Sequence, residues 1–274
     1  MARVEILLSI YVALFGLALG SFLGLAAERL PAGESVVRPR SRCRACDRQL
    51  AWYENVPVFS YLFLRGRCRS CGARIPPHHL LLEAATAALT VYAFHQIQPW
   101  PRFLLYLILF IAPVLLLIVI DFRHLLLPDT VTLPGVAAGF FLHWLDGRYF
   151  SPAPLASHWI LLWESLLGAL AGALTLLLLA LAYQRLRKRE GLGGGDVKFA
   201  AMLGALFGWK EIFFIFLLAS LLGIVFGVAL MLLRGQSKDA PLPFGSALGL
   251  VSLLFLFHGE RLIRGYLQFI RSLL

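Results

Sequence analysis

The sequence has 274 residues, of which 59% are hydrophobic and only 15% are charged. A typical soluble domain is about 45–50% apolar and about 25% charged, so this chain has too few polar side chains to cover a soluble globule of its size. The composition also excludes a disordered chain, a coiled coil and a disulfide-rich secreted module. A polytopic membrane protein remains, although a net charge of +10 is unusual for one.

Eight apolar segments are candidates for membrane-spanning helices. A spanning helix needs about 20 apolar residues, and these Leu- and Ala-rich runs lack the alternation of a transmembrane barrel strand. The first segment is interpreted as a retained helix, because its apolar run exceeds the about 7–15 residues of a signal-peptide core. The sequence therefore predicts an all-α polytopic membrane protein with about eight transmembrane helices. The five clear segments are 6–27, 80–98, 102–120, 159–183 and 210–233, and the three shorter ones are 131–145, 196–208 and 244–258.

The positive charge is distributed unevenly between the loops. Eighteen of the 25 Lys and Arg residues lie in or beside one alternating set of loops, and ten of them are in residues 28–79. Positively charged loops mark the cytoplasmic side of a membrane, so this set is predicted to be cytoplasmic and both termini to face outward. The basic residues are not interleaved with a stacking platform or a known motif, so no nucleic-acid binding is expected.

This topology divides the chain into four predicted parts. Residues 1–27 form the first transmembrane helix, and residues 28–79 form a cytoplasmic loop domain. Residues 80–258 form the remaining membrane core, and residues 259–274 form a tail. Because the tail carries three arginines on the predicted outer side, it could instead be an interfacial helix.

All four cysteines lie in the loop 28–79, as Cys43-x2-Cys46 and Cys68-x2-Cys71. Paired C-x2-C motifs are typical of a four-thiolate zinc site, which is structural because it leaves no coordination position for water. The two motifs resemble each other, which suggests two similar hairpins around one ion. Unrelated structural thiols and a redox dithiol are the alternatives. His78 and His79 could replace a thiolate ligand, but their position at a helix start favours an interfacial role.

Two aspartates lie at the predicted cytoplasmic ends of apolar segments. Asp121 ends one segment, and Asp196 follows Gly193-Gly194-Gly195 at the start of another. An ionisable residue inside a membrane segment suggests function by default. Two carboxyl groups brought together share one proton, so one acts as acid and the other as base to activate water against a peptide carbonyl. This pattern indicates an aspartyl protease at a membrane surface.

Structural roles for the same acids remain open. Asp196 could be a helix N-cap, and Asp121 could pair with Arg123 or a neighbouring helix. Asp129 competes with them as a catalytic candidate, but Pro128-Asp129-Thr130 favours an N-cap. Glu83 could act near the substrate N-terminus or form an interhelical bond.

The order of these motifs resembles the type IV prepilin peptidases over nearly the whole chain. The motifs are Gly20-Ser21-Phe22-Leu23 through Arg29-Leu30-Pro31, the paired C-x2-C loop with Asn55 to Tyr61 and Leu64-Arg65-Gly66, Asp121-x-x-His124-x-x-Leu127-Pro128-Asp129, Gly193-x-Gly195-Asp196 and Pro243-Phe244-Gly245.

The resemblance implies a bifunctional enzyme with Asp121 and Asp196 as its catalytic pair. It implies cleavage of a short basic leader from prepilin or pseudopilin precursors, after Gly and at the cytoplasmic face of the bacterial inner membrane. Methylation of the new N-terminal residue from S-adenosylmethionine would follow, with zinc bound by the cysteine loop. The supporting candidates are Gly193, Gly195, Lys198, Glu83 and Asp129, and the methyl-transfer candidates are Gly66 and Arg67.

The sequence departs from the family pattern in the loop and in the first helix. Arg67 stands where the family usually has Lys in Gly-Lys-Cys, the first knuckle lacks the usual Pro, and Gly24 replaces an Asn. Lys and Arg are not interchangeable, so the departures bear on methyl transfer more than on proteolysis.

Two other classes of function compete with this one. The first is a transporter or channel in which intramembrane aspartates bind ions and the zinc loop is regulatory. The absence of an evident inverted repeat weakens it. The second is a membrane scaffold whose zinc loop docks a partner.

Overall fold

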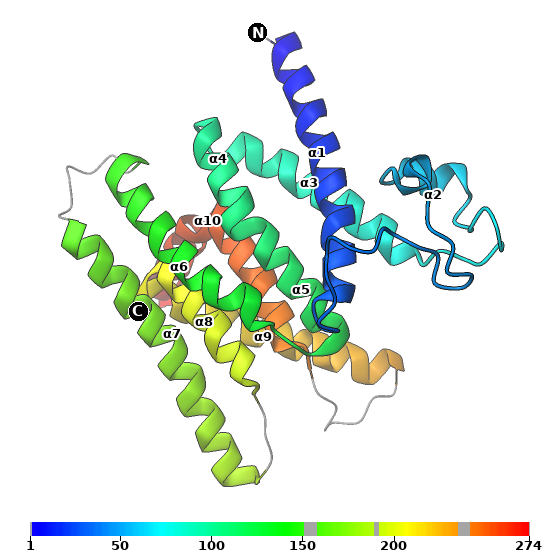
Figure 1. Cartoon of the computed structure of the whole chain (residues 1–274). Coiled ribbons are helices and arrows are strands. Elements are labelled where there is room, and N and C mark those ends of the chain that lie inside the picture. The colour runs from blue at the N-terminus through cyan, green and yellow to red at the C-terminus, as the bar shows by residue number, and fades with distance from the viewer. Residues whose placement is uncertain (1, 151–157, 189–191, 235–241, 274) are drawn as a thin grey trace. The chain divides into compact units, whose positions relative to one another are not determined.

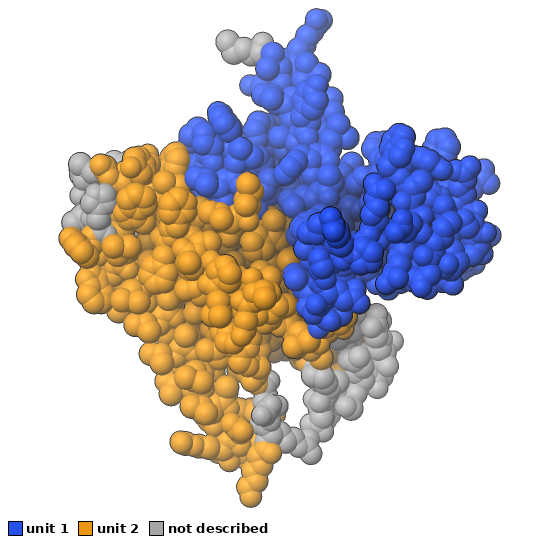
Figure 2. Space-filling model, in the orientation of Figure 1, with its two compact units in different colours: residues 1–107 blue, residues 108–274 orange. Residues whose placement is uncertain are grey.

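The computed structural model describes residues 2–150, 158–188, 192–234 and 242–273. It divides into two compact units, residues 1–107 and residues 108–274 (Figure 2). Both are built from helices, and in the described residues the extended pairing is limited to two isolated bridges. This agrees with the predicted all-α class.

In the first unit, helix α1 (Ala2–Arg29) packs along helix α3 (Pro77–Gln96) (Figure 1). Glycines allow the close approach: a Cβ on Gly16 or Gly20 would lie 2.7 Å from a backbone Cα of α3. The chain between the two helices contains the short helices η1 (Trp52–Asn55) and α2 (Phe59–Phe63).

A continuous helical stretch follows, made of α4 (Trp100–Tyr106), the π-helical turn η2 (Leu107–Ile111) and α5 (Ala112–His124). The predicted segment 102–120 therefore extends four residues further, through Asp121 to His124. Helix α5 ends because Leu125 adopts a left-handed conformation, with φ of 52°.

The second unit is arranged around helix α8 (Gly194–Phe207), which contacts α6 (Asp129–Leu145), α7 (His158–Arg187) and α9 (Trp209–Arg234) (Figure 1). The side chains of α8 are almost all buried beyond its first turn. Helix α10 (Phe244–Leu273) packs against α5, α8 and α9. The turn η3 (Asp146–Phe150) extends α6. The end of α5 that carries Asp121 and the beginning of α8 that carries Asp196 therefore lie within one unit.

Glycines again set the spacing at the contact of α7 and α8. A Cβ on Gly204 would lie 2.0 Å from the carbonyl oxygen of Gly168, and one on Gly168 would lie 2.1 Å from the carbonyl oxygen of Gly204. The Ser165 hydroxyl donates to the Ala205 carbonyl at 2.5 Å, which satisfies a buried polar side chain. The two backbones meet so closely that neither position has room for a side chain.

Among the described residues, five helices are long and apolar enough to cross a membrane. Helices also cover most of the remaining expected segments, but these helices do not satisfy the requirements of length and hydropathy together. The three segments are 80–98, 131–145 and 196–208. The count of eight crossings therefore stays a prediction. Helix α10 continues past residue 258, so most of the expected tail is helical as well. The five helical stretches are Arg3–Arg29, Trp100–His124, Trp159–Arg187, Trp209–Ala229 and Phe244–Ser272.

Candidate functional site

Asp121 lies in the last turn of α5, and its side chain is buried. Its Oδ2 accepts a hydrogen bond from the backbone N–H of Ser246 and lies 2.9 Å from the Ser246 hydroxyl. Ser246 is in the first turn of α10, where backbone N–H groups lack helical partners and the helix dipole favours a negative charge. The beginning of α10 therefore orients this carboxyl group.

Gly245 makes this approach possible. A Cβ at this position would lie 3.1 Å from both Cγ and Oδ2 of Asp121 and 2.8 Å from Cδ1 of Leu127. The glycine of Pro243-Phe244-Gly245 therefore allows the start of α10 to pack closely against the buried carboxyl group. Sequence reasoning singled out that motif but missed Ser246, because a serine after glycine gives no signal of its own.

Asp196 lies in the first turn of α8 and is half-buried. Its Oδ2 accepts the Gly193 N–H at 3.1 Å, and its own N–H donates to the Gly193 carbonyl at 3.1 Å. The bond from the Gly193 N–H is the carboxylate half of a capping box, with Asp196 at the third helical position, while Gly193 has no side chain to form the other half. Asp196 is therefore not the N-cap residue itself, since Gly193 occupies that position.

The glycines before Asp196 have different surroundings. A Cβ on Gly195 would lie 2.8 Å from Cβ and 3.2 Å from the carbonyl oxygen of Leu127, whereas one on Gly194 would meet nothing within 4 Å. The second glycine of Gly193-x-Gly195-Asp196 is thus required by a backbone contact. The intervening position tolerates a side chain.

Leu127 joins the two acidic segments. Its side chain lies against Gly245, beside Asp121, and its Cβ lies against Gly195, beside Asp196. The structure thus places both sequence-predicted aspartates in one region of the second unit.

Asp129 has a different environment from the one expected. Helix α6 begins at Asp129, its N-cap is Pro128, and no side chain caps it. Both carboxylate oxygens of Asp129 instead lie 2.6 Å from Nζ of Lys198 on α8. The prediction that Asp129 is an N-cap is therefore wrong, because a cation one helix away offers this carboxylate a stronger partner than the backbone does.

The cysteine loop forms two equivalent knuckles, as its sequence similarity predicts. In the first, the Cys43 N–H donates to the Arg48 carbonyl at 2.9 Å, and in the second the Cys68 N–H donates to the Ala73 carbonyl at 2.8 Å. Each knuckle also carries one isolated bridge, Arg42 with Gln49 and Arg67 with Arg74. The equivalent left-handed positions are Asp47, with φ of 57°, and Gly72, with φ of 71°.

The four thiols converge between the knuckles. All four Sγ atoms lie within 4.8 Å of one another, and Cys43 and Cys71 are 3.8 Å apart. Zinc–thiolate bonds of about 2.3 Å in a tetrahedron give a sulfur–sulfur edge of about 3.8 Å. Backbone N–H groups of Cys71 and Ser70 lower the pKa of the Cys68 thiol to about 6, which favours the thiolate that a metal requires. The donor set therefore fits zinc.

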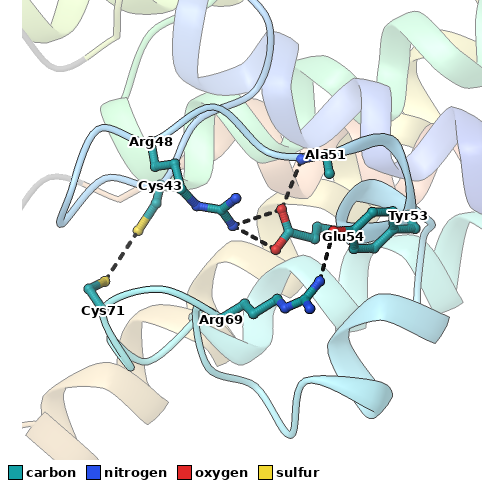
Figure 3. Close-up of polar contacts among 7 residues, drawn as sticks. All are labelled: Cys43, Arg48, Ala51, Tyr53, Glu54, Arg69 and Cys71. Carbon is teal, nitrogen blue, oxygen red and sulfur yellow. Dashed lines mark hydrogen bonds and ion pairs between the residues drawn. The ribbon is translucent and has the colours of Figure 1, made fainter.

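A layer of charged side chains supports the knuckles (Figure 3). Arg48 donates from one nitrogen to both oxygens of Glu54, at 2.6 and 2.8 Å, and Arg69 donates to the Tyr53 hydroxyl at 2.7 Å. The Ala51 N–H and then Arg48 hold the pKa of the buried Glu54 carboxyl below its usual value. One arginine from each knuckle thus reaches η1. Sequence reasoning missed this layer, since arginines are common throughout the loop.

Glu83 is half-buried on α3, where its Oε2 accepts the Val58 N–H at 2.7 Å. Val58 has φ of 62°, which is strained for a β-branched residue and needs support from its surroundings. Glu83 therefore connects the loop between α1 and α3 to α3.

The two methyl-transfer candidates lie where the second knuckle begins. Gly66 has φ of 66°, and a Cβ there would lie 3.0 Å from the Tyr61 ring. The Gly66 carbonyl accepts the Ile75 N–H at 2.7 Å. Arg67 is exposed. The glycine is therefore required by backbone conformation, and the arginine side chain is accessible.

Comparison with known proteins identifies the family. Residues 14–97 match the bacterial peptidase A24 N-terminal domain, and residues 107–228 match the type IV leader peptidase family. The prepilin leader peptidase/N-methyltransferase of Aeromonas salmonicida is 33% identical over 94% of this chain and 93% of its own length. Proteins of the same description from Pseudomonas aeruginosa and Bacillus subtilis are each 34% identical over 93% of this chain. The matches cover 92% of the Pseudomonas protein and 96% of the Bacillus protein.

No solved structure matches the chain. The family matches do not favour a transporter or channel, and they cover both the cysteine loop and the segments that carry the two aspartates. The chain therefore belongs to the type IV leader peptidase family and is an enzyme with peptidase activity.

Proposed function

We propose that this enzyme removes the short basic leader from prepilin or pseudopilin precursors, and that Asp121 and Asp196 are its catalytic pair. The relatives' descriptions support the substrate class. Leu127 supports the pairing, because it lies against Gly245, which adjoins Asp121, and against Gly195, which precedes Asp196, and so brings segments 75 residues apart to one place. The proposed catalytic pair rests on this shared contact with Leu127.

The chemistry follows from two carboxyl groups that share one proton. The ionised group takes a proton from a water molecule, whose oxygen then attacks the scissile carbonyl carbon. The protonated group donates to the developing oxyanion. Collapse of the tetrahedral intermediate breaks the C–N bond: the proton on the first group goes to the leaving amine, and the oxygen that re-forms the carbonyl returns its proton to the second group.

The surroundings of each acid serve this reaction in different ways. Ser246 orients Asp121, and the closed turn with Gly193 orients Asp196. Because carboxyl groups must be held close to the productive geometry, these hydrogen bonds would reduce the motion needed to reach the transition state. Gly195 and Gly245 allow the segments that carry the two acids to pack closely against Leu127.

The substrate would enter from the bilayer with its apolar helix among the helices of the enzyme. The enzyme would lie in the bacterial inner membrane. The positive charge of its loops supports a cytoplasmic position for the cysteine loop, and the scissile bond would be cleaved on the same side. Cleavage after Gly would release the leader there. Because the cysteine loop is itself basic, we expect acidic groups of the enzyme to bind the basic leader.

We further propose that the new N-terminal residue is methylated from S-adenosylmethionine, as the description of the relatives indicates. Cys43, Cys46, Cys68 and Cys71 would hold a structural zinc ion, which supplies folding energy to the loop when it is bound. Gly66 and Arg67 adjoin this centre in sequence and are candidates for the methyl-transfer surface.

Purified enzyme incubated with a prepilin peptide, with and without S-adenosylmethionine, tests both activities by mass spectrometry. The expected products are a leader ending in Gly and, only with the methyl donor, a mature peptide heavier by one methyl group. An intact peptide would contradict the peptidase proposal. A cleaved peptide without added mass would contradict the methyl-transfer proposal alone.

A further inference from the structure

Three potential metal ligands meet at the base of the cysteine loop, apart from the four thiols. Glu28 lies in the last turn of α1, and His78 and His79 lie in the first turn of α3. One ligand atom from each lies within 4.8 Å of the other two. Nε2 of His79 is 3.6 Å from Oε1 of Glu28, and the two imidazole centroids are 4.3 Å apart.

This convergence differs from ordinary helix geometry. Consecutive residues on a helix point in different directions, so neighbouring side chains do not usually reach one point. Here one nitrogen of each imidazole lies within 4.8 Å of the same carboxylate oxygen. The negative charge of Glu28 at the end of α1 is opposed by the dipole of that helix, so a cation beside this carboxylate would be stabilising.

The second oxygen of Glu28 has its own partner. Nη2 of Arg44 lies 2.5 Å from Oε2, while Oε1 faces His79. Ligating carboxylates are typically held by such an outer hydrogen bond, which fixes the orientation of the oxygen that binds the metal. Arg44 lies between Cys43 and Cys46, so it connects this cluster to the first knuckle.

We propose that Glu28, His78 and His79 bind a second divalent cation of the zinc type, in addition to the ion of the four thiolates. Two imidazole nitrogens and one carboxylate oxygen form a three-ligand set that leaves a position for water. The cluster joins the end of α1 to the start of α3, so the cation would fasten the base of residues 30–76. Glu28 and His79 are half-buried, with side chains 23% and 30% exposed, so an ion can enter from solvent.

Metal content of the full-length enzyme in detergent tests this site. Each protein is loaded with Zn²⁺ or Co²⁺, passed through a desalting column and measured by mass spectrometry of the metal. The variants are Glu28→Gln and the double variant His78→Ala/His79→Ala. His95→Ala is the matched control, because His95 lies at the other end of α3, with its Nε2 3.0 Å from the Ser9 hydroxyl oxygen.

The expected metal content is two equivalents for the wild type and for His95→Ala, and one for both test variants. In the Co²⁺ form, the thiolate-to-metal absorption should persist in both test variants, which shows that the loop is still folded. If the double variant loses that absorption, the result is read from Glu28→Gln. One equivalent in the wild type, or two in a folded test variant, would overturn the proposal.

Discussion

Gly195 offers a sharp test of the packing around the candidate catalytic pair. Substitution by alanine would place a Cβ 2.8 Å from Cβ and 3.2 Å from the carbonyl oxygen of Leu127. The first distance is about 1 Å shorter than a normal carbon–carbon contact of about 3.5–4.0 Å. Since one of the two partners is backbone, the first turn of α8 must move, and Asp196 moves with it.

The expected cost has two components. Overpacking of this size costs typically about 1–3 kcal/mol in stability. A displacement of about 1 Å of a catalytic group can lower the reaction rate by about 10²-fold. Gly195→Ala should therefore lose most of its activity while it remains folded.

Gly194→Ala is the matched control, because a Cβ there meets nothing within 4 Å. Replacing glycine in a helix by alanine gains up to about 1 kcal/mol, so this variant should be as active as the wild type and slightly more stable. The assays are kcat/KM on a prepilin peptide and thermal unfolding in detergent. Equal activity of Gly195→Ala and Gly194→Ala would refute the reasoning.

Three further outcomes follow from the structure. Gly204→Ala should lower the unfolding temperature markedly, because its Cβ would lie 2.0 Å from the Gly168 carbonyl oxygen, whereas Gly223→Ala, with nothing within 4 Å, should not. Similar unfolding temperatures for the two variants would contradict the proposed α7–α8 contact. A double-mutant cycle of Asp129→Ala and Lys198→Ala should give a coupling of at most about 1 kcal/mol, because both side chains are partly exposed. A coupling above about 3 kcal/mol would mean that the pair is shielded from solvent. Chelation of zinc should expose the backbone amides of the two knuckles to hydrogen exchange, and unchanged protection would argue against a metal-dependent loop.

The helical segments could be predicted because their signal is local. All eight predicted apolar segments are helical, because the apolar residues that predict a helix lie within each segment itself. The ends were less predictable: α5 continues to His124 because its stop depends on the conformation of Leu125, and α10 continues to Leu273 although its second half is more polar. Which helices cross the membrane depends on more than composition, and five of the eight satisfy length and hydropathy.

The similarity of the two cysteine knuckles was predictable for a related reason. The second knuckle repeats the first at a distance of 25 residues, and equal spacing produces equal backbone hydrogen bonds. Their supporting contacts were not predictable. Arg48 and Glu54 are six residues apart with no periodic relation, and only the folded loop brings them together.

The acidic site shows the same limit. Asp121 and Asp196 were identified because charge is costly in apolar segments. Their partners Ser246 and Leu127 carry no such signal, and they become visible only when α10 and the segment after α5 are packed. Asp129 was misassigned because a local pattern, Pro-Asp-Thr at a helix start, was outweighed by a lysine on another helix.

The most direct test of the proposed catalytic pair compares Asp121→Asn, Asp196→Asn and Asp129→Asn in the cleavage of a prepilin peptide. Loss of general acid or base catalysis lowers a rate by about 10²–10⁴-fold. Asp121→Asn and Asp196→Asn should each lose at least about 10²-fold in kcat while their thermal unfolding stays close to that of the wild type. Asp129→Asn should be less stable but should still cleave. Full cleavage by Asp121→Asn or Asp196→Asn, or an inactive but well-folded Asp129→Asn, would contradict the assignment of the pair.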